Sequence, residues 1–295
     1  MRSETFHSPG SVVLNLEIPS GEIILEAGDT EDTHVELEAL SKKEAMHELV
    51  NEARIDQLRR GDGHEIVVEV KPRRGIYLSW GEGPEIRHGG PDIRLRVTCP
   101  RGADLDIRTK SADIRARGEF GTVDVKTASG DISVEDAGGD ARVKTASGDV
   151  HFHDVKGRLD VKSASGDLHA DSVAGAAIVQ LVSGDLLIGD AGDSVTANTV
   201  SGDQRLEAVV QGRMELRAIS GDISVGIRRG SRLFVDANTV SGSTSSELEL
   251  GDTPEQEPSA EGPLVELFAK TVSGDVRIER APAPAAQTTE LGERA

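Results

Sequence analysis

Aspartate recurs along the chain at a regular interval, each time at the end of a Ser-Gly-Asp tripeptide or a close variant of it. The set comprises Asp113, Asp131, Asp149, Asp167, Asp185, Asp203, Asp222 and Asp275. Ca²⁺ takes oxygen ligands, and Gly- and Asp-rich turns supply them in calcium-binding β-rolls. The candidate calcium ligands are therefore the central members of the set, Asp131, Asp149, Asp167 and Asp185. A single Asp per unit favours the structural alternative, in which each carboxylate accepts hydrogen bonds from local backbone N–H groups.

Three histidines form a second candidate site. His169 follows His151 by one repeat interval, and His153 lies two residues beyond His151. In a stacked repeat, His151 and His169 would lie on the same outer face. With Asp154 and Asp171 nearby, these imidazoles could hold a zinc or nickel ion. Exposed histidines on neighbouring repeats are more often a solvated surface, and that interpretation is favoured.

A column of lysines is the third candidate. Lys126, Lys144 and Lys162 occupy equivalent positions in successive units, where Gln180 and Asn198 follow them. Such a column could bind phosphate or an acidic partner. The favoured interpretation is that the lysines neutralise the neighbouring aspartates.

The sequence offers no convincing catalytic site. Serine begins every Ser-Gly-Asp mark, whereas a nucleophile belongs to a single constellation. The chain has no nucleophile elbow, phosphate-binding loop or dinucleotide fingerprint. A polysaccharide-active enzyme is the enzymatic alternative, but it needs paired carboxylates and aromatic platforms. The only Tyr and Trp, Tyr77 and Trp80, lie outside the repeats and are more consistent with a hydrophobic plug than with a ligand-binding loop. We therefore expect no catalytic residues and no cofactor.

An internal repeat must position all of these side chains. The marks begin at Ser111, Ser129, Ser147, Ser165, Ser183, Ser201, Ser220, Ser241 and Ser273, at intervals of 18, 18, 18, 18, 18, 19, 21 and 32 residues. Between the marks, apolar and polar residues alternate as in strands with one dry and one wet face. Each unit is therefore predicted to form two short strands and two turns.

The apolar residues align in columns when the units are superposed. Columns through Ile132, Val134, Val123 and Val125 are expected to face inward. The same is expected of a fifth column, which comprises Ala128, Ala146, Ala164, Val182, Val200 and Ile219.

Two architectures fit such units. A β-solenoid turns the apolar columns inward and stacks like on like about 4.8 Å apart. A flat β-meander or prism would need a second layer over its apolar face, and the repeats contain no helices to provide one. We therefore predict an all-β protein with a β-solenoid of 18-residue rungs, a right-handed β-helix by the default for parallel coils.

Three segments are expected along the chain. Residues 1–102 lack the period but keep strand-like alternation, which predicts a strand-rich N-terminal cap with one short helix that ends before Arg54. The solenoid is expected over 103–280, with a solvated loop insertion at 251–263. Residues 281–295 are expected to be a disordered tail.

The open end of the solenoid is expected at the last strand of the repeats, Val276–Ile278. This strand is short, and Arg277, Glu279 and Pro282 protect its edge. We therefore expect a monomer or a weak homodimer rather than an open filament.

Composition limits the partners and the compartment. The 295 residues include 33 Lys and Arg against 52 Asp and Glu, a net charge of −19. This balance argues against nucleic acid or an anionic membrane as the main partner. The single cysteine, Cys99, permits no intrachain disulfide and no cysteine-based metal site. No apolar run is long enough to span a membrane and no secretory leader opens the chain, which predicts a cytoplasmic protein.

One segment and the repeats together resemble a known family. Residues 96–107 read RVTCPRGADLDI and precede repeated copies of Thr-Ala-Ser-Gly-Asp. This pattern resembles the DUF4097 family of bacterial β-strand repeat proteins, whose members are often labelled as candidate adhesins. The resemblance covers roughly residues 14–278 and implies a β-helical or β-prism-like fold without established catalytic residues. Many relatives accompany membrane or envelope-stress genes.

The resulting expectation is a non-enzymatic scaffold or adhesin-like protein that binds a protein partner through its solenoid faces. One alternative is a polysaccharide-active β-helix enzyme. Another is a regulatory partner of an envelope-stress system, which would place the protein at the envelope only through that partner.

Overall fold

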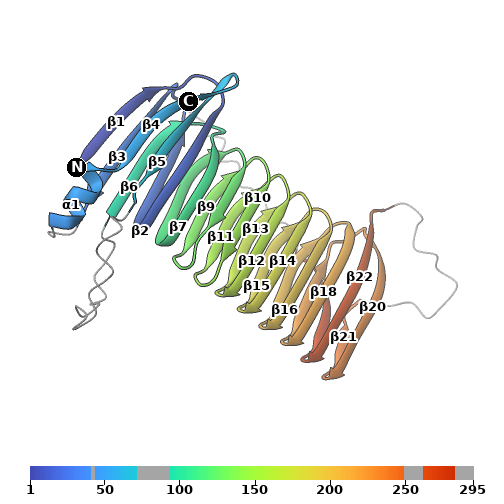
Figure 1. Cartoon of the computed structure of the whole chain (residues 1–295). Coiled ribbons are helices and arrows are strands. Elements are labelled where there is room, and N and C mark those ends of the chain that lie inside the picture. The colour runs from blue at the N-terminus through green and yellow to red at the C-terminus, as the bar shows by residue number, and fades with distance from the viewer. Residues whose placement is uncertain (41–43, 72–92, 249–261, 283–295) are drawn as a thin grey trace, which may run out of the picture.

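The computed structural model describes residues 1–40, 44–71, 93–248 and 262–282. Within these residues the chain forms 23 strands and one short helix, and hydrogen bonds join the strands into one continuous sheet. Figure 1 shows the sheet coiled into a rod of stacked rungs, with the helix and a group of further strands at the N-terminal end. The predicted all-β solenoid is confirmed.

Each repeat unit supplies two strands, and equivalent strands of successive units pair in parallel. One set comprises β8 (Val123–Lys126), β10 (Ala141–Thr145), β12 (Leu159–Ser165), β14 (Ala177–Ser183), β16 (Val195–Ser201) and β18 (Gly212–Ser220). The other comprises β9 (Ile132–Ala137), β11 (Val150–Val155), β13 (Leu168–Val173), β15 (Leu186–Ala191), β17 (Gln204–Val209) and β19 (Ile223–Ile227). The outer surface of the first set is named the lysine face, and that of the second set the histidine face.

The core lies between the two sets of strands and is filled by the aliphatic columns. Val143 pairs with Val161, which pairs with Val179, so like residues stack from rung to rung. Val161 is fully buried while the adjacent Lys162 is exposed. Burying a Val, Leu or Ile side chain contributes roughly 1.5–3 kcal/mol to folding. The predicted inward orientation of these columns is confirmed.

One apolar column faces outward, contrary to the prediction. Its members Ala128, Ala146, Ala164, Val182, Val200 and Ile219 are all exposed. The strand period of two explains the error, because Thr145 and Ser163 take the inward positions just before them. The Thr145 hydroxyl donates to the Ser147 carbonyl, and the Ser163 hydroxyl to the Ser165 carbonyl, each at 2.8 Å. These bonds satisfy the polar groups at the edge of the core.

The rungs extend into the segment that was expected to be a cap. β2 (Val12–Gly28) pairs in parallel with β7 (Asp104–Phe120), in a register that places Ser20 beside Ser111. On its other side, β2 pairs in parallel with β5 (Gly63–Glu69) and β6 (Ile93–Pro100). β2 is therefore a rung of the rod, and Ser20-Gly21-Glu22 is a further copy of the corner tripeptide.

Antiparallel strands close the N-terminal end. β4 (Arg54–Arg60) pairs with β5, β3 (Asp32–Ala39) pairs with β6, and β1 (Arg2–His7) pairs with β3. The predicted short helix is present as α1 (Glu44–Asn51). This helix of the described residues is neither long nor apolar enough to cross a membrane.

The last two rungs stack in an order that differs from the chain order. β22 (Leu264–Ser273) lies between β18 and β20 (Arg232–Ser241), and β23 (Val276–Arg280) lies between β19 and β21 (Thr244–Ser246). The open end therefore belongs to β20 and β21, and the prediction that Val276–Ile278 forms the outer edge is wrong. The repeat pattern could not reveal this order, because Ser241 and Ser273 fit the same column equally well.

Candidate functional site

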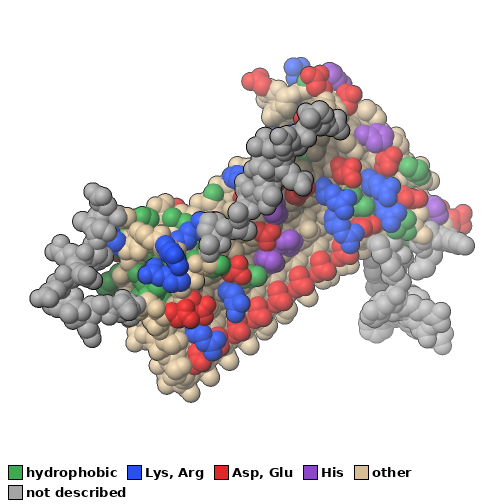
Figure 2. Space-filling view, turned by 180° about the vertical axis from the view of Figure 1, so that it is seen from behind, with side chains coloured by type: hydrophobic (Ala, Val, Ile, Leu, Met, Phe, Trp, Pro, Cys, Tyr) green, Lys and Arg blue, Asp and Glu red, His purple; other side chains and the backbone are tan. Residues whose placement is uncertain are grey.

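The repeated aspartates form a hydrogen-bonded ladder along one edge of the rod. The N–H of Asp149 donates to Asp131 Oδ1 at 3.0 Å, that of Asp167 to Asp149 Oδ1 at 2.9 Å, and that of Asp185 to Asp167 Oδ1 at 2.8 Å. Figure 2 shows acidic side chains as a row along the molecule. Each carboxylate thus accepts a backbone N–H, as the structural alternative required, but from the next rung rather than from its own turn. Within the described residues, none of these four aspartates joins a cluster suited to a metal ion.

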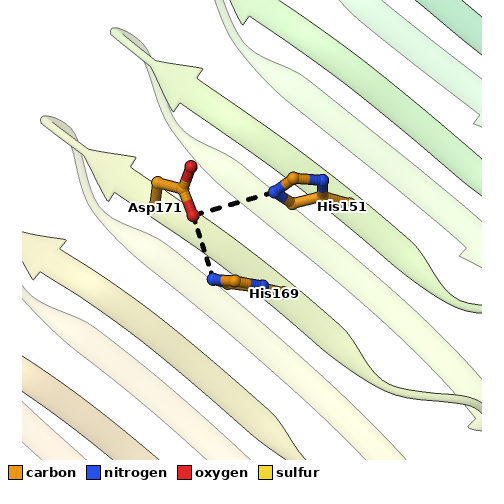
Figure 3. Close-up of side chains that lie close together, drawn as sticks. All are labelled: His151, His169 and Asp171. Atoms are coloured by element: carbon orange, nitrogen blue, oxygen red, sulfur yellow. Dashed lines mark ion pairs between the residues drawn. The ribbon is translucent and has the colours of Figure 1, made fainter.

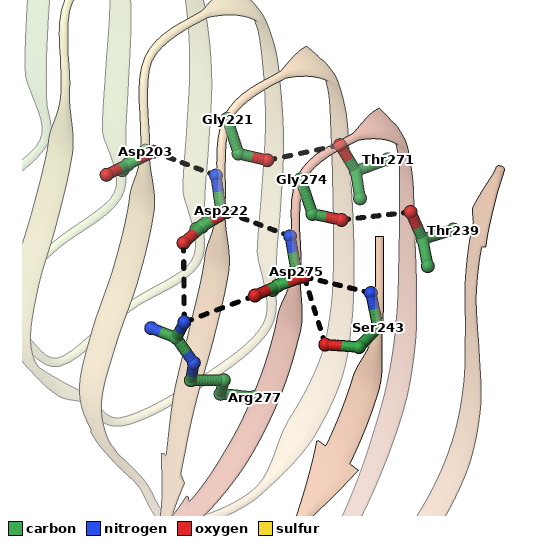
Figure 4. Close-up of polar contacts among 9 residues, drawn as sticks. All are labelled: Asp203, Gly221, Asp222, Thr239, Ser243, Thr271, Gly274, Asp275 and Arg277. Carbon is green, nitrogen blue, oxygen red and sulfur yellow. Dashed lines mark hydrogen bonds and ion pairs between the residues drawn. The ribbon is translucent and has the colours of Figure 1, made fainter. Parts of the chain in front are cut away.

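The ladder ends at the rung that lies last in space (Figure 4). The N–H of Asp222 donates to Asp203, and the N–H of Asp275 donates to Asp222, each at 2.8 Å. Asp275 Oδ1 then accepts the N–H and the hydroxyl of Ser243 at 2.8 and 3.0 Å. These two hydrogen bonds lower the pKa of Asp275, and the bond from the backbone N–H has the larger effect. Ser243 replaces Asp at the terminal rung, beyond which no further rung of the described residues presents an N–H.

The glycine of each corner is required by backbone geometry. Gly166 has a φ of +110°, a conformation that side chains with a Cβ rarely adopt. A Cβ at this position would also lie 2.3 Å from the carbonyl oxygen of Gly148 in the preceding rung. The glycine of the Ser-Gly-Asp tripeptide is therefore required by the fold.

The histidine face carries a compact group of polar side chains (Figure 3). His151 of β11 pairs directly with His169 of β13, and their ring centroids are 4.9 Å apart. Asp171 Oδ1 lies 2.9 Å from His169 Nε2 and 3.7 Å from His151 Nε2. His153 Nδ1 lies 2.7 Å from Asp171 Oδ2. The structure therefore brings together the three predicted histidines and Asp171 on the outer surface, as expected.

The electrostatics of this group are those of a carboxylate surrounded by imidazoles. The hydrogen bond to Asp171 raises the pKa of His153. Partial burial raises the pKa of Asp171, but the hydrogen bond from His153 and the charges of the three histidines outweigh it, and the pKa of Asp171 lies below its usual value. Asp154 instead forms an ion pair with Lys156.

A groove of about 950 Å³ runs along the lysine face from β8 to β18. One wall is the basic and polar column Lys126, Lys144, Lys162, Gln180, Asn198 and Arg217. The other wall comprises Ala146, Ala164, Val182, Val200 and Ile219. This apolar wall was missed in the sequence because the column was assigned to the core, although the strand period could have placed it outside.

The lysines do not neutralise the aspartate ladder. Lys126 pairs with Asp124 on its own strand at 3.1 Å, and Lys144 and Lys162 form no ion pair with any described residue. Among the described residues, the ladder's only ion-pair partner is Arg277, which lies 3.7 Å from Asp222 and 3.3 Å from Asp275. The groove therefore presents positive charge that the ladder does not compensate.

Exposed apolar side chains continue beyond the groove toward the open end. Val182, Val200 and Ile219 are 51, 44 and 55% exposed, and Val272 and Val240 extend the same column at 49 and 82%. We refer to these five residues as the apolar stripe. On the same face, the rings of Phe234 and Phe268 lie 5.8 Å apart, and Arg213 stacks over Phe268 at 4.3 Å.

Other candidates give little support for catalysis. Burial raises the pKa of the Cys99 thiol to about 12, so it is not a reactive thiolate. A small surface groove gathers Glu119, Asp136 and Asp154, but none of the described residues that line it is a Phe, Tyr or Trp. Tyr77 and Trp80, and most of the predicted loop at 251–263, lie outside the described residues.

The chain was compared with solved structures, with curated proteins and with models of protein families. Two solved structures, each 10% identical, are a candidate adhesin of Bacteroides fragilis NCTC 9343 and a candidate cell adhesion protein of Clostridium sporogenes ATCC 15579. The alignments cover 94% of this chain and 96% of the former, with a TM-score of 0.43, and 95% and 99% for the latter, with a TM-score of 0.22. No curated protein matches the chain. The model of the family described as Toastrack DUF4097 matches residues 13–279, from β2 to β23, and the chain therefore belongs to this family.

Proposed function

We propose that this protein is a non-enzymatic scaffold that binds a protein partner along its lysine face. The observation that carries the proposal is the groove, in which the exposed side chains of Val182, Val200 and Ile219 follow Lys144 and Lys162 along the same face. These two lysines form no ion pair with any described residue. Contiguous exposed apolar surface is uncommon on soluble proteins and marks interaction sites. Lys144 and Lys162 add positive charge at one end of a surface that the described residues leave exposed.

The partner segment is expected to be acidic and amphipathic. Its apolar ridge would cover Val182, Val200 and Ile219, and acidic residues that follow this ridge in the partner would face Lys144 and Lys162 in the adjoining rungs. Because the chain as a whole carries a net charge of −19, an acidic partner would be attracted to this face and repelled by most others, which favours one binding orientation. An α-helix suits the groove, since its rise of about 5.4 Å per turn is close to the rung spacing of about 4.8 Å.

Site-specific photocrosslinking in the native host tests the proposal. A benzoylphenylalanine at position 200 should form a discrete crosslinked adduct, and one at Leu187, which points outward on the histidine face, should not. Replacing Val182 and Ile219 together with Ser should reduce the adduct by more than about tenfold, because apolar contact dominates such grooves.

Charge reversal gives a matched second test. Lys162→Glu should weaken the same adduct by up to about fivefold, the value of one exposed ion pair. The control, Arg205→Glu, makes an identical change of charge on the histidine face at a residue with no ion pair to a described residue. Equal loss in both variants, or an adduct that survives the double Ser replacement, would contradict binding through the lysine face.

A further inference from the structure

Four side chains on the histidine face form a square across two neighbouring rungs. His151 and His153 are two residues apart on β11, and His169 and Asp171 are two residues apart on β13. Residues with this spacing point to the same side of a sheet, and the parallel register places the two pairs side by side. All four side chains reach solvent, at 46, 62, 48 and 40% exposure.

We propose that His151, His169 and Asp171 bind a zinc ion. One ligand atom from each, a ring nitrogen of either histidine and a carboxylate oxygen of Asp171, lies within 4.8 Å of the others. Tetrahedral Zn²⁺ with bonds of 2.0–2.1 Å requires ligand atoms about 3.3 Å apart. The separations from Asp171 Oδ1 are 2.9 Å to His169 and 3.7 Å to His151, so small side-chain rotations would satisfy that geometry. Water would complete the coordination from the exposed side.

His153 has a separate role as a positioning residue. It binds Asp171 Oδ2 at 2.7 Å, the oxygen that does not face the other two histidines. A hydrogen bond of this kind orients a metal-ligating carboxylate and is a common feature around protein zinc sites. Asp171 is thereby held with its Oδ1 toward His151 and His169.

The square is not a product of the repeat. In the preceding rung the equivalent residues of β9 are Ser133 and Glu135, and in the following rung those of β15 are Leu187 and Gly189. The fold therefore does not require imidazoles at these positions. Asp171 also differs from the ladder aspartates. The carboxylates of Asp149 and Asp167 each accept a hydrogen bond from a backbone N–H, whereas no described backbone N–H donates to the carboxylate of Asp171.

Equilibrium dialysis of the untagged, full-length protein against ZnCl₂ tests the site. One zinc ion per chain is expected. His169→Ala and Asp171→Ala should each weaken binding by at least about tenfold, and His153→Ala by a smaller factor, since it acts through Asp171. The matched control is His34→Ala, which removes an exposed histidine that also faces a carboxylate, that of Glu36 at 3.2 Å, and should leave zinc uptake unchanged.

A spectroscopic readout separates coordination from loose surface association. Co²⁺ bound in the same place should show the visible absorption of a four-coordinate site, which the double variant His151→Ala/His169→Ala should lack. Circular dichroism checks that each variant folds, and His169→Gln replaces His169→Ala if it does not. No uptake at about 100 μM zinc, or equal uptake by the wild type and a folded double variant, would overturn the proposal.

Discussion

The backbone N–H of Asp275 donates a 2.8 Å hydrogen bond to the carboxylate of Asp222, although 53 residues separate the two in the chain. The chain passes through β20 and β21 before it returns to place β22 and β23 in the intervening gap. The terminal rung therefore depends on strands that follow it in the sequence, and Asp275 bonds to rungs on both of its sides.

The first prediction concerns the pH dependence of this junction. The hydrogen bonds from Ser243 lower the pKa of Asp275 in the folded state, so the carboxylate stabilises the fold above its unfolded pKa of about 3.9. That stabilisation is lost as the pH falls through the lower, folded pKa. Asp275→Asn should therefore lower the melting temperature at pH 7, and the difference from the wild type should shrink in strong acid. A difference that grows on acidification would contradict the assignment.

The second prediction tests the inward and outward assignment within one strand. Val161→Asp would bury an unpaired charge and destabilise the fold by several kcal/mol, by order of magnitude. The neighbouring Lys162→Glu should change stability by less than about 0.5 kcal/mol, because the side chain is solvated. Urea unfolding measures both. Equal shifts of the midpoint would mean that the alternation is misplaced.

The third prediction separates two costs of replacing a glycine that has a positive φ. Gly230 has a φ of +90° with open space around it, whereas Gly166 has a φ of +110° and a neighbouring carbonyl in the way. Gly230→Ala should therefore cost about 1–2 kcal/mol for backbone strain alone. Gly166→Ala should cost clearly more, because the rung must also move away from Gly148. Similar losses in the two variants would show that the contact between rungs is unimportant.

The fourth prediction is that chelation leaves the fold intact. The rungs are held by backbone pairing, buried aliphatic columns and the aspartate ladder, and the proposed zinc site lies on the surface. Addition of EDTA should therefore change the melting temperature by less than about 2 °C. A fall of more than about 10 °C, reversed by calcium, would assign the ladder to a metal-dependent β-roll instead.

The fifth prediction concerns association at the open end. β20 presents its outer edge together with Phe234 and Val240, which are 52 and 82% exposed. The edge is a template for strand pairing, but the net charge of −19 opposes unlimited stacking. We expect a monomer or a weak dimer by light scattering at low and physiological salt, with less dimer in Val240→Lys. Regular filaments at both salt concentrations would identify a polymer-forming scaffold.

The sequence predicted the rung but not the order of the rungs. The alternation around Val161 and the spacing of the Ser-Gly-Asp marks were sufficient for the solenoid, because one unit repeats with little change. The role of Ser20 was hidden since 91 residues separate it from its spatial neighbour Ser111. The insertion of β22 between β18 and β20 could not be predicted from the sequence, because the rungs are so similar that their order of stacking is not evident from the repeat pattern.

The candidate sites were only partly predictable for a related reason. The repeat interval placed His151 and His169 side by side, since both lie in regular rungs. The partner of each charged side chain depends on rotamers, which the sequence does not specify. Lys126 accordingly pairs with Asp124 rather than with the ladder. The outward position of Val200 followed from strand parity, but its apolar character suggested the core.

The out-of-order rungs at both ends make the rod extensible only in its middle. β2 is enclosed between β5–β6 and β7, and β22–β23 are enclosed between β18–β19 and β20–β21. Adding a unit at either end would break these interlocked connections. Duplicating or deleting one unit between Ser129 and Ser201 would instead leave both ends unchanged and alter the length by about 4.8 Å. The number of units in the middle of the rod therefore sets the distance between the N-terminal strands and the open end, and this distance can change by one repeat at a time.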